Sequence, residues 1–570
     1  MQRPLAALAD ETFDLIIVGG GIFGACAAWD ATLRGMKVAL LERLDFGAGA
    51  SANSFKMIHG GIRYLQHLDL PRLRASCRER SAFLRVAPHL AHPLPIAIPT
   101  YGHGRKGKAF LGTGMLLYDL LTLDRNRGIA DPARRIPLTR FLSREEILAE
   151  FPDLPSEGLT GAAVFADGQM YNPTRLTWSF VRSASEHGAT VCNHIEVTRL
   201  LDGEDAREAA GVMARDLVSG EEIPIRGRCI LNTAGPWAAR VLAGTPGVTP
   251  PRTTFSRDTC FLVRRRFGSD LALAVSARTR DPDAILSRDA RHLFLVPWRD
   301  WTLVGVWHVV YPRDADHLEI TPEQLESYLD EINWAYPTLN LTPDDITICN
   351  AGLVPFGEND PDARDLSYGK RSVLIDHERQ GECRNLVTLI GIRYTMARGD
   401  SARAVDLAAR KLGFRTARPP TDRLPVHGGD FDHFDALVAE IRGRLPSGDA
   451  AVAESLAHNH GSAYGEVLDS ARGPEDLEPI ESTRVLPAQI RHAVRNEMAL
   501  SLADVVFRRT DLATGGHPGD SVLDHAARLV GEVLGWNETT LTEQRAAVAR
   551  RFDCLGNWLA AESLPKGAST

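Results

Sequence analysis

Gly19, Gly21 and Gly24 have the type and spacing of a loop that cradles a diphosphate. They follow an apolar run at residues 15–18 and precede a stretch with helical character. Gly19 permits a tight turn, Gly21 lets a pyrophosphate approach the backbone, and Gly24 lets the helix pack closely on the strand. The helix N-terminus would then offer unpaired N–H groups and its positive dipole end to phosphates.

An acidic residue follows at the distance that ribose recognition requires. Glu42 ends a second apolar run, residues 38–41, eighteen positions after Gly24. A carboxylate at this point can accept hydrogen bonds from ribose hydroxyls. Strand, turn, helix, strand and acid within residues 14–42 therefore predict a dinucleotide-binding unit. The alternative is a glycine-rich turn without a ligand.

Two further apolar runs end in glycine far along the chain. Residues 229–232 lead to Gly235, and residues 386–390 lead to Gly391. In a doubly wound sheet such turns meet at the carboxyl ends of the strands, where ligands bind. A nicotinamide enzyme needs mainly the first turn, whereas an extended FAD would use all three, so the pattern favours FAD. The alternative is that the later turns only end their strands.

The composition limits the fold and the partners. A chain of 570 residues is too long for one core, so we expect two or three domains. The net charge of −8 argues against bulk attraction to nucleic acid. The eight cysteines contain no C-x-x-C pair, which argues against a metal site or a disulfide framework and favours a reducing compartment. We find neither a signal-peptide pattern nor an apolar run long enough to span a bilayer.

The periodicity predicts an α/β fold in which an FAD-binding Rossmann-like domain is joined by a β-rich substrate domain and a helical C-terminal cap. We expect helices at residues 71–93, from Thr321 onward and at residues 400–412, a hairpin around residues 219–220, a linker at residues 413–428, and helices from about residue 430. The FAD-binding segments are expected at about 12–100, 170–250 and 350–415, the interleaved substrate segments at about 100–170 and 250–350, and the helical domain at 426–570.

Three blocks of sequence resemble one family. They are residues 19–24 (Gly-Gly-Gly-Ile-Phe-Gly), residues 58–65 (Ile-His-Gly-Gly-Ile-Arg-Tyr-Leu) and residues 232–237 (Asn-Thr-Ala-Gly-Pro-Trp). The chain resembles FAD-dependent glycerol-3-phosphate dehydrogenases, within the wider group of D-amino-acid-oxidase-like flavoproteins. A further block, residues 491–510, is similar to the helical C-terminal domain of that family.

The resemblance implies a flavin that accepts hydride from a secondary alcohol, leaving a ketone, with a quinone or oxygen as the final acceptor. It also implies which residues contact FAD. These are Gly19, Gly21, Phe23, Gly24, Glu42, Arg43, Ser51, Ser54, Lys56, His59, Gly60, Gly61, Ala234, Gly235, Trp237, Gly391, Arg393, Tyr394 and Thr395.

The substrate side departs from the family pattern. Val354 stands where the family has a phosphate-binding arginine, Arg393 replaces a lysine, and His308 replaces a carboxylate. The histidine of a Lys-Gly-Ser-His segment is missing at residues 256–259. Two substrates remain open: glycerol 3-phosphate, or a different polyol or sugar-like alcohol. Lys370 and Arg371 are candidates for replacing the lost phosphate contact.

Alcohol oxidation also needs a base, and two histidines are candidates. His59 follows the cofactor motif, and His308 lies on an apolar strand where a plain core role is the alternative. Arg63 and Arg393 could stabilise an anionic substrate or the reduced flavin, and Tyr64 could donate to the substrate oxygen. Other roles remain open for these residues: His59 could tune the flavin, Arg63 could form a structural salt bridge, and Tyr64 could pack on the ring.

Residues 103–123 combine three basic residues with a short apolar run, which is the composition of a surface helix on a membrane or of a buried helix. We therefore expect a cytoplasmic protein, either free or peripheral on the inner face of the cell membrane. A homodimer is a further expectation. Two other functions stay open: a flavin oxidase of amines or amino acids, and a flavin-binding protein without turnover.

Overall fold

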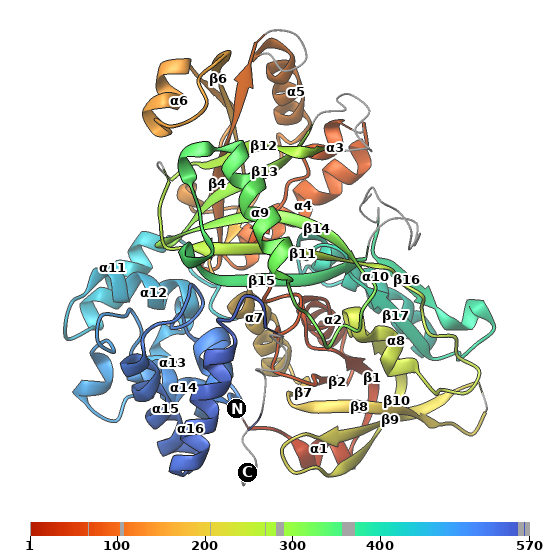
Figure 1. Cartoon of the computed structure of the whole chain (residues 1–570). Coiled ribbons are helices and arrows are strands. Elements are labelled where there is room, and N and C mark those ends of the chain that lie inside the picture. Colours follow the sequence, from red (N-terminus) through yellow and green to blue (C-terminus); the bar gives the residue numbers. More distant parts are fainter. Residues whose placement is uncertain are drawn as a thin grey trace.

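The computed structural model describes residues 2–66, 68–102, 108–205, 207–267, 270–280, 290–355, 371–556 and 564 (Figure 1). In that part of the chain, two large sheets and a group of C-terminal helices make up the molecule. The expected α/β class with a helical C-terminal domain is confirmed.

The first sheet is built on parallel strands. Its parallel elements and the helices that cover them are β1 (Thr12–Val18), α2 (Ile22–Leu33), β2 (Val38–Leu41), α7 (Pro173–Glu186), β7 (Thr190–Cys192), β10 (Glu222–Asn232), β17 (Leu386–Ile390) and α10 (Ala397–Leu412). β1 lies between β2 and β10, with β7 and β17 outside them. The apolar runs in β1 and β2 are buried because helices cover the sheet.

Antiparallel strands extend the first sheet. They are β8 (Ile195–Asp202), β9 (Ala209–Asp216) and β16 (Val373–Asp376). The expected hairpin joins β9 to β10, with Gly220 at a φ of +81° in its turn.

The second sheet is mostly antiparallel and runs β15-β11-β14-β13-β12-β4-β6-β3, with β5 paired to β6. Its strands are β3 (Met57–Ile58), β4 (Ala91–Tyr101), β5 (Arg140–Leu142), β6 (Leu159–Met170), β11 (Phe255–Val263), β12 (Ala272–Arg280), β13 (Ala290–Trp298), β14 (Trp301–Tyr311) and β15 (Ile346–Pro355). Because β4 pairs with β6 and β12, residues 91–100 lie with this sheet and not with the first, where we expected them. The expected helix after Thr321 is α9 (Pro322–Ala335), which begins with a capping box and packs on β12.

One expected helix is shorter than its pattern. Residues 71–93 read as a single helix, but α4 (Leu70–Val86) ends at Val86. Pro88 follows two residues later, and proline cannot continue a helix because it lacks an N–H and disfavours helical backbone in the residue before it. The chain then enters β4 at Ala91.

The C-terminal domain is helical, as expected from residue 430 onward. Its main helices are α11 (Phe434–Arg444), α12 (Ala450–His460), α13 (Tyr464–Leu468), α14 (Pro487–Asn496), the π-helical turn η10 (Asp504–Arg509), α15 (Asp520–Leu534) and α16 (Glu538–Arg550). They bury two apolar clusters of their own. Figure 1 shows these blue helices beside α7 of the first sheet. None of the helices in the described residues combines the length and apolar character needed to cross a membrane.

Candidate functional site

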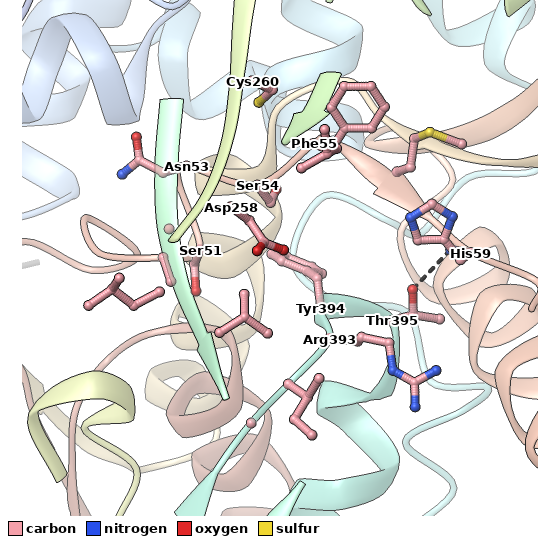
Figure 2. A pocket seen from close by; sticks show the side chains of 18 of the residues that line it. Ser51, Asn53, Ser54, Phe55, His59, Asp258, Cys260, Arg393, Tyr394 and Thr395 are labelled. Atoms are coloured by element: carbon pink, nitrogen blue, oxygen red, sulfur yellow. Dashed lines mark hydrogen bonds between the residues drawn. The ribbon is translucent and has the colours of Figure 1, made fainter. Parts of the chain in front are cut away.

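A cavity of about 1370 Å³ is lined by residues of both sheets. The three expected glycine turns meet on it, since Gly19, Gly235 and Gly391 are all lining residues. Figure 2 shows Ser51, from the loop after β2, and Asp258, from β11 of the second sheet, among the side chains that line the cavity. The turns are brought together because β1, β10 and β17 are parallel neighbours, so their carboxyl ends share one edge.

The first turn requires glycine for geometric reasons. Gly19 has a φ of +102°, a backbone conformation that side chains disfavour. A Cβ on Gly24 would lie 1.8 Å from the Gly19 carbonyl oxygen. Gly21 precedes α2, which has no side-chain N-cap, so the positive end of the helix faces the cavity.

Glu42 joins the second strand to this turn. Its Oε2 accepts a hydrogen bond from Gly20 N at 2.6 Å, and its Oε1 accepts one from Leu44 N at 2.8 Å. Burial raises the pKa of Glu42, while these two N–H groups act in the opposite direction. Each carboxylate oxygen keeps a second lone pair, which can accept a hydrogen bond from a ribose hydroxyl.

The loop at residues 43–54, which follows β2, supplies polar groups to the part of the cavity beside the first sheet. Ile22 N donates to Ser51 Oγ at 3.0 Å, which places the hydroxyl at the start of α2. Asn53 and Ser54 also line the cavity. Hydroxyl and amide donors beside a helix N-terminus suit a diphosphate.

Asp316, in the segment after β14, connects the loop after β2 to the second turn. Its Oδ1 accepts hydrogen bonds from Arg43 at 2.8 Å and from Trp237 Nε1 at 2.7 Å, and its Oδ2 is paired with Arg240. The Arg43 guanidinium also lies 5.2 Å from the centre of the Trp237 ring. Burial acts to raise the pKa of Asp316, but its hydrogen bonds and the charge of Arg43 lower it to about 2.

These residues fit FAD. The first turn offers a close backbone approach, Glu42 is placed for a ribose, and the Ser51 loop is placed for phosphates. The third turn is equally tight, because a Cβ on Gly391 would lie 2.0 Å from the Phe23 ring. Three convergent turns in one long cavity suit an extended dinucleotide.

His59 lines the cavity and is paired with a carboxylate. Its Nδ1 lies 3.5 Å from Asp167 Oδ2, and its backbone N–H donates to Thr395 Oγ1 at 2.9 Å (Figure 2). Asp167 Oδ1 accepts hydrogen bonds from Gly60 N at 2.6 Å and from Arg80 at 2.7 Å. Burial acts to raise the pKa of Asp167, but His59, Arg80 and Gly60 together hold it below its ordinary value. The His59 side chain is 50% exposed, so its ring is accessible.

His308 forms the second pair, on the other wall. It lies opposite Asp258 in the register of β14 and β11, and its Nδ1 is 2.8 Å from Asp258 Oδ1. Ser256 Oγ donates to the same carboxylate oxygen at 2.8 Å. Both members of the pair line the cavity. His308 is therefore not a plain core residue, which was the alternative left open by the sequence.

Arg393 and Tyr64 lie together on the cavity wall. The Arg393 guanidinium is 5.1 Å from the centre of the Tyr64 ring. Burial lowers the pKa of Arg393, which the negative charge of Asp400 only partly offsets. Within the described residues, Arg393 has no ion pair with a carboxylate.

Most of the expected cofactor and catalytic residues line the cavity. They are Gly19, Gly21, Phe23, Glu42, Arg43, Ser51, Ser54, His59, Gly61, Tyr64, Ala234, Gly235, Trp237, His308, Gly391, Arg393, Tyr394 and Thr395. Gly24 and Gly60 lie just behind the wall, where Gly24 contacts the Gly19 carbonyl and Gly60 holds Asp167.

Lys56 is a correction to the expected set. Phe55 and Met57 line the cavity, but Lys56 between them does not. Its ammonium lies 4.9 Å from the centre of the Trp298 ring, and burial lowers its pKa to about 8. Lys56 has a φ of +57° in the bend before β3, and this left-handed backbone turns its side chain away from the cavity that Phe55 and Met57 line.

Of the expected substitutes for the phosphate-binding arginine, the structure describes Arg371. Arg371 is exposed and is not a lining residue. Lys370 and the side chain of Arg63 lie outside the described residues.

Sequence reasoning missed the carboxylates that hold the two histidines. Asp167 sits within β6, where residues 161–170 are all buried. An acid inside such an apolar run was a usable signal, because a buried charge needs partners. Asp258 gave no comparable signal, because its partner is 50 residues away and the strand register is set by the fold.

Comparison with known proteins supports FAD binding and a distinct C-terminal domain, and the similarity extends over most of the chain. The family described as FAD dependent oxidoreductase matches residues 14–397, and the C-terminal domain of alpha-glycerophosphate oxidase matches residues 419–541. The glycerol-3-phosphate dehydrogenase 2 of Mycobacterium bovis is 30% identical over 562 residues, covering 97% of this chain and 90% of that protein. The glycerol-3-phosphate dehydrogenase of Synechocystis sp. is 29% identical over 95% of this chain and 97% of that protein.

The solved structures support the fold. The glycerol-3-phosphate dehydrogenase from Bacillus halodurans, complexed with FAD, superposes with a TM-score of 0.74 at 23% identity, covering 97% of this chain and 96% of that one. At this identity the likeness establishes the shared architecture, including the helical C-terminal domain that follows the two sheets.

Proposed function

The chain belongs to the family of FAD dependent oxidoreductases, and from that membership we propose that it oxidises the secondary alcohol of glycerol 3-phosphate, or of a related polyol phosphate, to a ketone. The similarity to glycerol-3-phosphate dehydrogenases extends over both the FAD-binding part and the C-terminal domain. The structural observation that carries the proposal is Arg393, a cation on the cavity wall that has no carboxylate partner among the described residues.

Arg393 takes over the recognition of phosphate in this proposal. Val354 lines the cavity at the position where the family resemblance places an arginine, so that contact is lost. A charge-assisted pair between Arg393 and a phosphate contributes about 1.5–3 kcal/mol. Burial disfavours the lone charge of Arg393, and a phosphate beside it would relieve that cost.

His59 is the base in this proposal. Bound FAD supplies the two-electron acceptor for the hydride of the alcohol carbon. His59 takes the hydroxyl proton on Nε2, because Nδ1 faces Asp167. Arg80 and Gly60 N hold Asp167, so the ring keeps one orientation and the resulting imidazolium is stabilised by a fixed carboxylate. The hydrogen bond from His59 N to Thr395 ties the base to the third turn.

The His308–Asp258 pair has a binding role. It lies on the second sheet, whereas the turns that suit FAD belong to the first. With Trp307, which also lines the cavity and donates to Glu331 at 3.0 Å, it forms a polar wall for the hydroxyl groups of the substrate.

Anaerobic reduction of the bound flavin tests the function. We expect glycerol 3-phosphate or another polyol phosphate to bleach the visible flavin absorption of the purified holoenzyme. Unphosphorylated polyols should bleach it much more slowly, and amines and amino acids should leave it unchanged over the same time. Bleaching by an amine or amino acid alone would favour the oxidase alternative, and no bleaching by any substrate would favour a binding protein without turnover.

We also propose that the electrons pass to a quinone at a membrane surface. The helix α5 (Lys108–Leu121) and the segment after it expose Leu116 (63%), Leu120 (64%) and Leu123 (72%). Leu117 on the same helix is 43% exposed and also lines the cavity, so the apolar surface is continuous with the site. An exposed apolar surface of this kind is typical of a contact with lipid or a partner.

Co-sedimentation with anionic lipid vesicles tests this contact. The parent protein should pellet with vesicles at low salt, and the double variant L116S/L120S should remain in the supernatant. The variant should keep its flavin bleaching by substrate but lose reduction of a lipophilic quinone in vesicles. Equal sedimentation of both proteins would argue against the proposal.

A further inference from the structure

The C-terminal motif at residues 491–510 contributes no lining residue to the cavity, nor does any other described residue after Thr395. We propose that it acts at a distance, by positioning the cofactor-binding loop at residues 43–54. In this proposal the C-terminal domain sets how tightly the chain holds FAD. The contacts that carry the proposal lie at the two ends of the loop.

At the first end, two arginines of η10 donate hydrogen bonds to the carboxylate of Asp45. Arg509 donates to both oxygens of Asp45, at 2.6 and 2.7 Å, and Arg508 Nε donates to Asp45 Oδ2 at 2.9 Å. Asn193 Nδ2 donates to Asp45 Oδ1 at 2.9 Å. These ionic side chains are buried, so water cannot replace either partner without opening the interface.

Short connections lead from Asp45 to the cavity wall. Leu44, its neighbour, donates its backbone N–H to Glu42, the expected ribose ligand. Phe46, on the other side, packs against Gly20 so closely that a Cβ on Gly20 would lie 2.6 Å from its ring. Gly47 N then donates to the Gly20 carbonyl at 3.1 Å. A displacement of Asp45 would therefore move both Glu42 and the first glycine turn.

At the second end, Arg551 reaches the loop from the end of α16. Its guanidinium donates to Asn53 Oδ1 at 3.0 Å and to Asn350 Oδ1 at 3.2 Å. Asn53 lines the cavity and donates to the Gly49 carbonyl at 3.0 Å. Ser51, which accepts the hydrogen bond from Ile22 at the start of α2, lies between these two residues. The C-terminal domain thus holds the loop on both sides of residues 48–51, which line the cavity.

The same cluster could instead be read as a metal site, since Asp45, His194 and Asp504 place ligand atoms within 4.8 Å of one another. The arginines argue against a cation. Arg508 donates to Asp45 and, at 2.6 Å, to Asp504, so both carboxylates are already neutralised. The arrangement is that of a polar link between two domains.

The test compares two aspartate-to-asparagine variants of the full chain. D45N breaks the link to the loop. D511N is the matched control, because Asp511 pairs with Arg299 at 2.9 Å at another contact of the C-terminal domain, away from the loop. For each deflavinated protein, the dissociation constant for FAD is measured by flavin fluorescence, and unfolding is measured in urea.

We expect D45N to raise the dissociation constant for FAD by about tenfold or more, and D511N to change it by less than about threefold, although both variants unfold at lower urea. An unchanged dissociation constant in D45N, or an equal rise in D511N, would overturn the proposal. If D45N does not fold, R551K decides. Arg551 Nη2 donates to both amide oxygens while Nη1 donates to the Cys349 carbonyl at 2.9 Å, and lysine keeps the charge but has one nitrogen and cannot reproduce this planar fork. R551K should then weaken FAD binding by about threefold or more, and unchanged binding would overturn the proposal.

Discussion

The two walls of the cavity recognise their ligands by different means. The cofactor wall uses backbone: Gly19 has a left-handed φ and Gly391 lies against the Phe23 ring, so neither position has room for a Cβ. The substrate wall uses side chains on β-strands, such as Asp258 and His308, whose register is fixed by a sheet that would form with other polar residues in the same places. A backbone site can change little without losing its ligand, whereas a side-chain site can change specificity and keep its fold.

This contrast agrees with where the sequence departs from the family pattern. The glycine turns and Glu42 are present, and the differences at Val354, Arg393 and His308 all lie on the substrate side or facing it. Conversion to a new substrate therefore requires no change in how FAD is held.

The largest effect is expected on the cofactor wall, from G24V. The first added carbon would lie 1.8 Å from the Gly19 carbonyl oxygen and 2.8 Å from Thr233 Oγ1. We expect the purified variant to contain no flavin, as measured by the ratio of flavin to protein absorbance. G443A is the matched control, since a Cβ on Gly443 meets nothing within 4 Å. Normal flavin content in G24V would contradict the conclusion that the cofactor wall depends on glycine backbone.

The next effect concerns the two histidines. H59A should lower kcat by about 10²–10⁴, because the base is lost. H308A should lower kcat/KM by about tenfold or less, through weaker substrate binding. Stopped-flow measurement of flavin reduction separates these outcomes. A larger loss of kcat in H308A than in H59A would identify His308, on the substrate wall, as the base.

Replacing the free cation tests phosphate recognition. R393M should lower kcat/KM for a phosphorylated polyol by about 10- to 100-fold, the equivalent of one charge-assisted contact. Its activity on an unphosphorylated alcohol should change little. Steady-state kinetics on the matched pair of substrates gives the comparison, and equal losses on both would assign Arg393 to the cofactor instead.

Restoring the family's arginine should have a smaller effect. V354R adds a guanidinium to a cavity wall that already contains Arg393. We expect the KM for a phosphorylated polyol to fall by about threefold to tenfold, with kcat little changed. A rise in KM would indicate that the substrate occupies the space beside Val354 with an uncharged group.

The smallest effect is on stability, at Asp316. Its pKa of about 2 lies below the ordinary value, because Arg43 and Trp237 stabilise the carboxylate. The folded state therefore holds fewer protons there than the unfolded state, and the stabilisation is present above about pH 4 and lost as the pH falls toward 2. The difference in urea stability between the parent and D316N should be constant above pH 5 and shrink below pH 4. A difference independent of pH would contradict the assigned ion pair.

The cofactor wall was predictable from the sequence because its signals are local. Residues 15–24 and 38–42 contain strand, turn, helix and acid in one short segment, and each later turn is also a strand followed by glycine. The substrate wall was harder to predict from the sequence. His308 could be named, but Asp258 could not be assigned to it, since the pair forms only when β11 and β14 align.

Two other sequence predictions were wrong: the placement of Lys56 and the length of the helix expected at residues 71–93. Lys56 was expected at FAD because its charge suits phosphate, but its backbone has a left-handed φ of +57°, which turns the side chain toward Trp298, and a lysine in the sequence gives no signal of that conformation. The helix at residues 71–93 was overextended because the polar pattern continues past Pro88, whereas the proline ends it.

The pairing of β17 with β10 has a consequence for the synthesis of the chain. Residues 230–232 of β10 must wait for residues 386–388 before that edge of the sheet is covered. A nascent chain on the ribosome therefore carries an open, apolar strand edge while the intervening residues are made. Premature termination before residue 386 would leave that edge permanently unpaired, so truncated products of this gene should aggregate or be degraded and should not persist as flavin-free fragments.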